Sequence, residues 1–148
     1  MTETFRNDLG FFYNSGEVEV TQELFSWVLT ARFPLESPSV QPALSTMLAL
    51  QGTSTVDVTF WYNAEKMEAN EGFKLQYSTD FGSSWTNVSS YVFGEGGFDT
   101  TDKWNLAQQE TFEVDAGMDM VMIRIIGETN LGLSDSVFHI AGINIYGA

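Results

Sequence analysis

Hydrophobic and polar residues alternate with a period of two along much of this chain. Between residues 55 and 62, every even-numbered residue from Val56 to Tyr62 is hydrophobic, and the residues between them are mostly polar. Successive side chains of a β-strand point to opposite faces, so this alternation predicts a strand with one buried face. The segment Phe73–Ser78 repeats the pattern. Further runs that we predict as strands are Gly16–Gln22, Leu24–Phe33, Ser45–Leu50, Trp85–Val92, Glu110–Val114, Asp119–Ile126 and Ser136–Tyr146.

Turn-forming residues, rather than long helical patterns, separate these runs. They are Asn14–Gly16, Gln51–Gly52, Gly94–Gly97, Asp115–Gly117 and Leu131–Gly132. About eight to ten short strands with frequent turns are typical of a sandwich or barrel rather than of βαβ units. We predict a loop or edge connection over Pro34–Pro42, because proline cannot donate to a sheet ladder. One short helical turn is predicted over Ala64–Asn70.

Length and composition favour one folded domain. The chain has 148 residues, of which 43% are hydrophobic and 14% aromatic, and a domain of this size buries roughly 70% of its unfolded surface. It has no cysteine, which excludes disulfides and thiolate metal sites. We therefore predict a single domain over residues 1–148, with residues 1–16 as an edge strand or as an N-terminal arm that docks on a neighbour.

The charge of the chain bears on its partners. Twenty acidic and six basic residues give a formal net charge of −14. Nucleic acids and anionic membranes bind proteins through clustered Lys and Arg, and the six basic residues here are scattered. We therefore expect neither as a partner. No run approaches the length of a membrane span, and the segment MTETFRNDLGFFYN lacks the basic and apolar regions of an export signal.

Residues 78–85 read Ser-Thr-Asp-Phe-Gly-Ser-Ser-Trp. They resemble the Asp-box hairpin, a Ser-x-Asp-x-Gly-x-(Ser/Thr)-Trp turn found in sialidases and many other β proteins. We expect a structural hairpin built on Ser78, Asp80, Gly82 and Trp85. In it Asp80 accepts backbone N–H bonds across the turn, Gly82 takes a positive φ and Trp85 packs beneath the turn. A sialidase would carry several such hairpins and an arginine cluster, whereas this chain has one copy and three arginines.

A wider pattern covers residues 44–147. Its segments are Val58–Tyr62, Phe73–Asp80, Ser84–Val88, Val121–Ile125 and Val137–Gly147. In this order they resemble the MAM-type and carbohydrate-binding-type jelly-roll modules. The resemblance implies an all-β fold, an antiparallel jelly-roll β-sandwich. In that family an N-terminal acid and an Asp in the last strand help to hold calcium, but Arg6 and Ala141–Gly142 stand there in this chain. We therefore predict no metal site.

The chain offers few residues for catalysis. Its single histidine, His139, lies in a predicted strand, and the sequence marks no partners for a triad or a metal site. The acid pairs Glu17/Glu19 and Asp99/Asp102 have the chemistry of glycoside hydrolysis. With 20 acids among 148 residues, such pairs arise by chance. We predict no enzymatic activity and no cofactor.

An aromatic stretch over residues 90–99 is the candidate binding surface, together with Trp104. Exposed rings beside polar groups suit a sugar, whose apolar faces stack on them. In this interpretation Tyr91, Phe98 and Trp104 form the carbohydrate-binding platform. In the alternative, Tyr91 and Phe93 fill the core, while Phe98 and Trp104 cap one end of the sandwich.

Two functional hypotheses follow. The first is a non-enzymatic structural or assembly protein, such as a capsid-decoration or fibre-attachment module on the surface of a phage or virus particle. A lone jelly roll with its own Met1 and no attached enzyme motivates it, and its partners would be other subunits, including copies of itself. The second is a carbohydrate-binding or adhesion module, which the family resemblance supports. We expect a virion-surface or extracellular location and rank the assembly hypothesis first.

Overall fold

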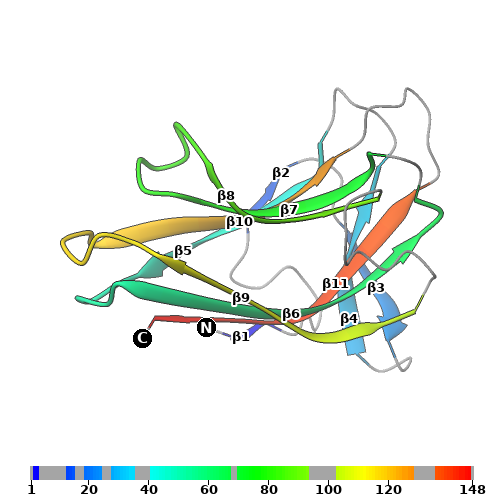
Figure 1. Ribbon diagram of the computed structural model, residues 1–148. Coiled ribbons are helices and arrows are strands. Elements are labelled where there is room, and N and C mark those ends of the chain that lie inside the picture. The colour runs from blue at the N-terminus through cyan, green and yellow to red at the C-terminus, as the bar shows by residue number, and fades with distance from the viewer. Residues whose placement is uncertain are drawn as a thin grey trace.

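The computed structural model describes residues 2–3, 13–15, 19–24, 28–35, 41–67, 70–93, 103–128 and 136–147. In this part of the chain it has eleven strands, all paired antiparallel in two sheets, and no helix (Figure 1). Sheet A contains β1 (Thr2–Glu3), β3 (Glu19–Leu24), β4 (Val28–Pro34), β6 (Thr55–Glu65), β9 (Asn105–Glu113) and β11 (Val137–Gly147). Sheet B contains β2 (Tyr13–Ser15), β5 (Ala43–Ala49), β7 (Gly72–Ser78), β8 (Thr86–Val92) and β10 (Met120–Glu128).

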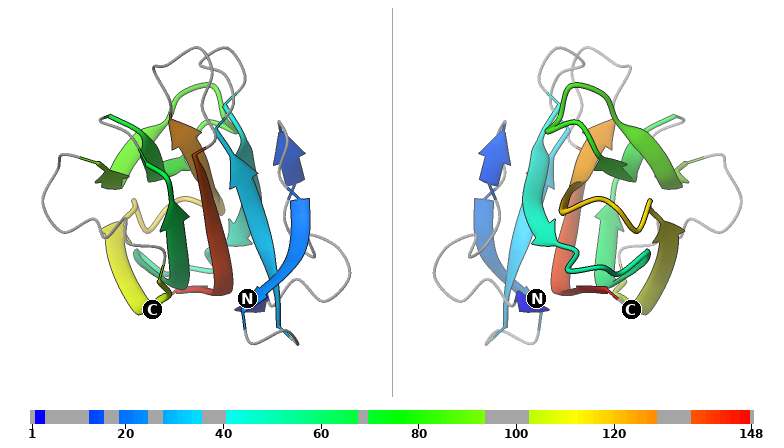
Figure 2. Two further views of the ribbon diagram at one scale, coloured as in Figure 1. Left: turned by 90° about the vertical axis from the view of Figure 1, so that its right-hand side faces the viewer. Right: turned by 90° about the vertical axis from the view of Figure 1, so that its left-hand side faces the viewer.

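The chain passes back and forth between the two sheets. Sheet A has the order β3-β4-β11-β6-β9, with β1 also paired to β11, and sheet B has the order β2-β5-β10-β7-β8. Figure 2 shows β11 (red) between β4 (blue) and β6 (green). From β5 to β7, and again from β8 to β11, each strand lies in the sheet opposite to the previous one. The architecture confirms the predicted antiparallel jelly-roll β-sandwich, with two of its eleven strands only two and three residues long.

Aromatic rings from both sheets fill the space between them. Phe33 of β4 stacks on Phe138 of β11 with 4.3 Å between the ring centroids. Phe138 stacks in turn on Phe73 of β7 at 4.7 Å, and Phe73 stacks on Tyr91 of β8 at 4.7 Å. All four side chains are buried. We call these residues the ring stack. The even-numbered residues of β6 from Val56 to Ala64 are also buried, as their alternation predicts.

The predicted helical turn over Ala64–Asn70 is wrong where the structure describes it. Ala64 and Glu65 complete β6, where they pair with β11. Lys66 then takes a positive φ of 55°, which ends the strand. Residues 68–69 lie outside the described residues. The hydrogen bonds to β11 outweigh the local helix propensity of this segment.

Two predicted strand boundaries are also wrong. The segment Leu24–Phe33 is not one strand, because Leu24 ends β3 and faces Val28 at the start of β4. On the far edge of sheet A, β9 begins at Asn105 rather than at Glu110. Ala107 interrupts the alternation there with a φ of 55°. Of the predicted connection over residues 34–42, the first residue ends β4, and residues 36–40 lie outside the described residues.

The ring stack predicts where the sandwich is most sensitive to truncation. Phe73 stacks on two rings and meets Phe60 and Tyr62 edge-on. We expect Phe73→Ala to lower the free energy of unfolding by about 3–5 kcal/mol, measured by urea unfolding, because it leaves a cavity between the sheets. The matched control is Phe93→Ala, which removes a partly exposed ring. A loss below about 1 kcal/mol for Phe73→Ala would contradict this role.

Candidate functional site

The hairpin between β7 and β8 turns tightly at residues 80–83. The N–H of Ser83 donates to the carbonyl oxygen of Asp80 at 3.3 Å. The two central residues, Phe81 and Gly82, have φ values of 58° and 88°, as a type I′ turn requires. Glycine adopts this conformation freely, but a bulky residue such as Phe81 is strained in it. The Phe81 side chain is nevertheless 75% exposed, so core packing does not explain its position.

Side chains of the same hairpin hold the turn in place. The Ser78 hydroxyl donates to Asp80 Oδ1 at 2.7 Å and accepts from the N–H of Gly82 at 2.8 Å. Asp80 Oδ1 also accepts from the N–H of Ser84 at 2.9 Å, and Asp80 Oδ2 accepts from the Ser84 hydroxyl. The bonds from the Ser84 hydroxyl, the Ser78 hydroxyl and the Ser84 N–H lower the pKa of Asp80 from 3.8 to about 2.

A row of polar side chains crosses the outer face of sheet B beside this hairpin. Arg124 of β10, Gln76 of β7 and Asn87 of β8 stand opposite one another in the sheet register. Arg124 Nε donates to Gln76 Oε1 at 2.8 Å, and Gln76 Nε2 donates to Asn87 Oδ1 at 2.8 Å. The guanidinium carbon of Arg124 lies 4.0 Å from the ring centroid of Trp85. We call Arg124, Gln76 and Asn87 the polar row. Two hydrogen bonds and the Trp85 ring thus link side chains from three neighbouring strands.

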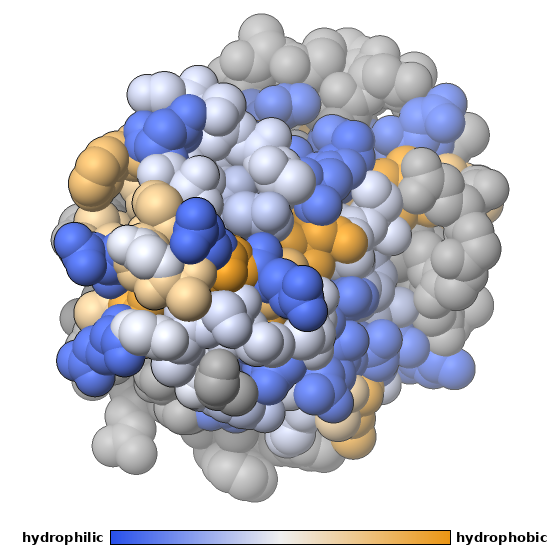
Figure 3. Space-filling model, turned by 60° about the vertical axis from the view of Figure 1, so that its left-hand side comes forward, coloured by the Kyte–Doolittle hydropathy of each residue, from blue (hydrophilic) through white to orange (hydrophobic). Residues whose placement is uncertain are grey.

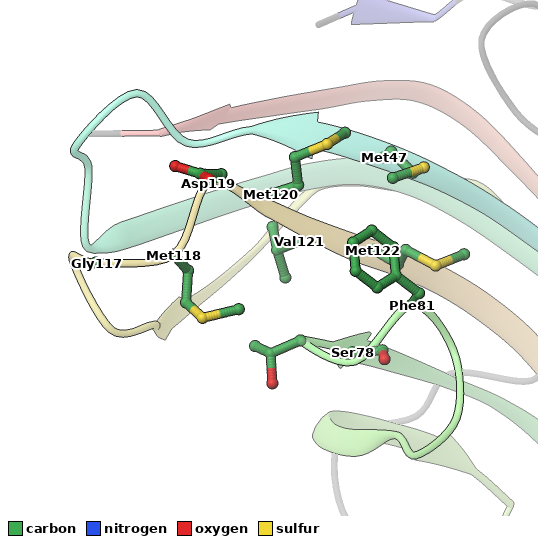
Figure 4. Close-up of a pocket in the computed structure, with 10 residues that line it drawn as sticks. Met47, Ser78, Phe81, Gly117, Met118, Asp119, Met120, Val121 and Met122 are labelled. Atoms are coloured by element: carbon green, nitrogen blue, oxygen red, sulfur yellow. The ribbon is translucent and has the colours of Figure 1, made fainter.

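A pocket of about 340 Å³ lies between the β7–β8 hairpin and the turn that leads into β10. Figure 4 shows its lining side chains on both sides of β10, with Met47 on β5 and Phe81 on the hairpin. Its apolar lining includes Met47, Met118, Met120 and Met122. We call this cavity the methionine pocket. Figure 3 shows weakly hydrophobic residues gathered among hydrophilic ones on the side of the molecule that carries these turns.

The structure does not assemble the predicted platform of Tyr91, Phe98 and Trp104. Tyr91 is only 8% exposed and belongs to the ring stack, where its hydroxyl donates to Glu110. Burial, followed by this hydrogen bond, raises the pKa of Tyr91. Placing Tyr91 on a stacking platform was therefore wrong, because its ring is buried and stacks on Phe73 in the core. Phe98 lies outside the described residues, and the half-buried ring of Trp104 lies 6.3 Å from that of His139.

The remaining candidates for chemistry are not brought together. His139 is buried in β11, opposite Asn63 of β6. Glu17, Asp99 and Asp102 lie outside the described residues. In the described ranges, no three side chains of the metal-binding types gather at one point. No helix found there is long and apolar enough to cross a membrane.

Sequence reasoning missed Phe81, the polar row and the methionine pocket. Gln76 and Arg124 were visible only as the polar positions of two alternating segments that lie 48 residues apart. Their pairing depends on the sheet register, which no local pattern encodes. The alternation of Met118, Met120 and Met122 with other residues was the one available signal for the pocket.

Comparisons with known proteins add information about the fold. No family model and no curated protein match the chain. A structure of TmCBM61 in complex with β-1,4-galactotriose superposes with a TM-score of 0.62 at 17% identity, covering 95% of this chain and 90% of that chain. The K1 cleaved adhesin domain of Lys-gingipain from Porphyromonas gingivalis W83 gives 0.57 at 14% identity, covering 100% and 98%.

The enzymatically active domain of bacteriophage CBA120 tailspike protein 4 is also similar, with a TM-score of 0.54 at 11% identity. That match covers 98% of this chain but 20% of the tailspike chain. Further structures with this fold are carbohydrate-binding modules. At these identities the likenesses show the β-sandwich fold.

The strained turn predicts a stabilising substitution. Phe81→Asn keeps the turn but places a residue there that tolerates the left-handed region. Because this region costs an ordinary residue about 1–2 kcal/mol, we expect the free energy of unfolding to rise by about 1 kcal/mol in urea titrations. Phe93→Asn, at an exposed residue without a positive φ, is the control and should not stabilise. Equal effects of the two substitutions would refute the strain at Phe81.

The lowered pKa of Asp80 predicts a pH dependence. Because the folded pKa of about 2 lies below the ordinary value of 3.8, the stabilisation by Asp80 is present in full above about pH 4. It is lost as the pH falls through 2, where the folded carboxylate takes up a proton. In thermal unfolding, Asp80→Asn should therefore lower Tm most at pH 6, and the difference from the native protein should shrink below pH 4. A difference that stays constant down to pH 2 would exclude this linkage.

Proposed function

We propose that this protein is a non-catalytic carbohydrate-binding module that binds an uncharged glycan on the outer face of sheet B. The observation that carries the proposal is the polar row of Arg124, Gln76 and Asn87. The Trp85 ring lies against Arg124, and the same hairpin exposes the Phe81 ring at its tip. The carbohydrate-binding modules among the structural neighbours support the same class of function. We infer an extracellular location to go with it.

The chemistry of the polar row suits sugar hydroxyls. A hydroxyl both donates and accepts, and the row offers guanidinium N–H donors next to amide groups that carry both donors and acceptors. Gln76 engages only Nε of the Arg124 guanidinium and thereby fixes its plane. Side chains that are already ordered lose little further entropy on binding. A glycan lying across β10, β7 and β8 would meet these groups in sequence.

Aromatic rings supply the apolar half of sugar recognition. Phe81 is largely exposed at the tip of the hairpin, and its backbone strain has no role in packing the core. Strained residues of this kind concentrate at functional sites. The face of a pyranose ring stacks on such a ring, while its hydroxyls reach polar groups at the side. Phe81 therefore takes the stacking role that the sequence had suggested for Tyr91.

The negative charge of the chain favours neutral glycans over anionic ones. The formal net charge of −14 repels polyanions, which include uronic-acid-rich and sulfated polysaccharides. Neutral polysaccharides escape this repulsion. The assembly hypothesis has narrower support, since the match to a phage tailspike domain is to a fifth of that chain. Glycan binding is therefore the function that the geometry favours.

The proposal predicts which substitutions abolish binding. A glycan array of neutral polysaccharides identifies the ligand, and calorimetry then compares variants. We expect Gln76→Ala to weaken binding about tenfold, since it removes one hydrogen bond and frees the Arg124 guanidinium that Gln76 orients. Tyr146→Ala, at a residue of sheet A that is 45% exposed, is the control and should bind like the native protein. If the native protein binds no glycan, or if only the control loses affinity, the proposal fails.

A further inference from the structure

The methionine pocket differs in chemistry from the polar row next to it. It takes in four of the six methionines of the chain, and its volume of about 340 Å³ lies at the small end of the range for ligand pockets. Figure 4 shows the side chains of Met47, Met120 and Met122 arranged over neighbouring strands, with the ring of Phe81 beside them. Binding of sugar hydroxyls by the polar row does not by itself require an apolar pocket next to it.

The walls of this pocket suit an apolar group rather than a hydroxyl. Thioether side chains are polarizable and adapt to the shape of small apolar groups. They leave a buried hydroxyl without a strong hydrogen-bond partner, which is unfavourable. Three polar residues also line the pocket: the Ser78 hydroxyl is already engaged by Asp80 and Gly82, while Thr79 and Asp119 are exposed to solvent. Asp119 is the charged residue among the described lining residues, and it disfavours an anionic group.

The pocket is continuous with the polar row. Met122 and Arg124 lie two residues apart on β10 and therefore point to the same face of sheet B. Gly82 lies close to Met122 and to Trp85, the ring on which Arg124 stacks, because a Cβ added to it would stand 3.5 Å from the Trp85 ring and 3.7 Å from the sulfur of Met122. A single ligand can therefore contact the polar row and the methionine pocket at the same time.

We propose that the methionine pocket is a specificity subsite for an apolar substituent, a methyl, 6-deoxy or O-acetyl group, on a neutral glycan held by the polar row. The inference rests on the proposed function and adds the class of glycan to it. The strained turn sets Phe81 as a fixed wall of the subsite. The substituent enters the pocket, while the hydroxyls of the same sugar or of its neighbour face Arg124 and Gln76.

Matched pairs of probes test this inference. One pair is methyl α-L-rhamnoside and methyl α-L-mannoside, which differ only in a methyl or hydroxymethyl group at C5. The other is an O-acetylated glucomannan before and after alkaline deacetylation. We expect the native protein to prefer the substituted member of at least one pair about tenfold, the usual effect of a small apolar group in a hydrophobic pocket.

Variants separate the subsite from the rest of the surface. The double substitution Met47→Gln with Met122→Gln keeps side-chain length but makes the walls polar. We expect it to bring the two members of the preferred pair to within about twofold while affinity for the unsubstituted member persists. Leu106→Gln, at an exposed residue of β9 in sheet A, is the control and should keep the preference.

A readout on the native protein guards against misfolded variants. In a sample labelled with ¹³C at the methionine methyl groups, the signals of Met47, Met120 and Met122 should shift with the substituted probe, and that of Met67 should not. Equal binding of both members in each pair would overturn the subsite and leave the proposed function standing. Binding of neither member of either pair, with no hit among neutral polysaccharides on the array, would overturn both.

Discussion

The ring stack of Phe33, Phe138, Phe73 and Tyr91 joins the two sheets, and the rest of the molecule is arranged around it. A chain without cysteine has no disulfide between its sheets, so packing between their inner faces must hold them together. Because successive side chains alternate between faces, burying one set of residues on β7, β8 and β10 sends the other set to the outer face of sheet B. The polar row belongs to that other set, and so do Met120 and Met122 of β10.

The β7–β8 hairpin turns this outer face into a site with two chemistries. Ser78 and Asp80 stabilise a turn that Phe81 alone would disfavour, and the turn holds the Phe81 ring in solvent beside the sheet. Trp85, at the base of the hairpin, stacks under Arg124. The polar row and the methionine pocket therefore both lie on the outer face of sheet B, next to this hairpin. Stability lost to strain at the tip is offset by hydrogen bonds below it.

Local alternation was enough to predict most strands and the sandwich. In segments such as 55–62 and 73–78, hydrophobic residues stand mainly at every second position, and these are the positions that the sheet buries. Alternation could not predict the site, because Arg124 and Gln76 face each other only through the register between two strands that are distant in the sequence. Tyr91 shows a second limit. A register shift between β7 and β8 puts Asn87 opposite Gln76 but Tyr91 opposite Phe73. Asn87 and Tyr91 both have odd numbers and would share a face in a regular strand, but here they face opposite sides of the sheet, as a β-bulge allows.

The central claim is that a glycan binds to the outer face of sheet B. Its most direct test is a ¹H–¹⁵N NMR titration with a glycan that the protein binds, following the side-chain amides of Gln76 and Asn87 and the indole N–H of Trp85. The account predicts that these three signals shift first and most, together with the backbone amides of residues 79–84. Shifts confined to sheet A, around Leu106 and Tyr146, would contradict it.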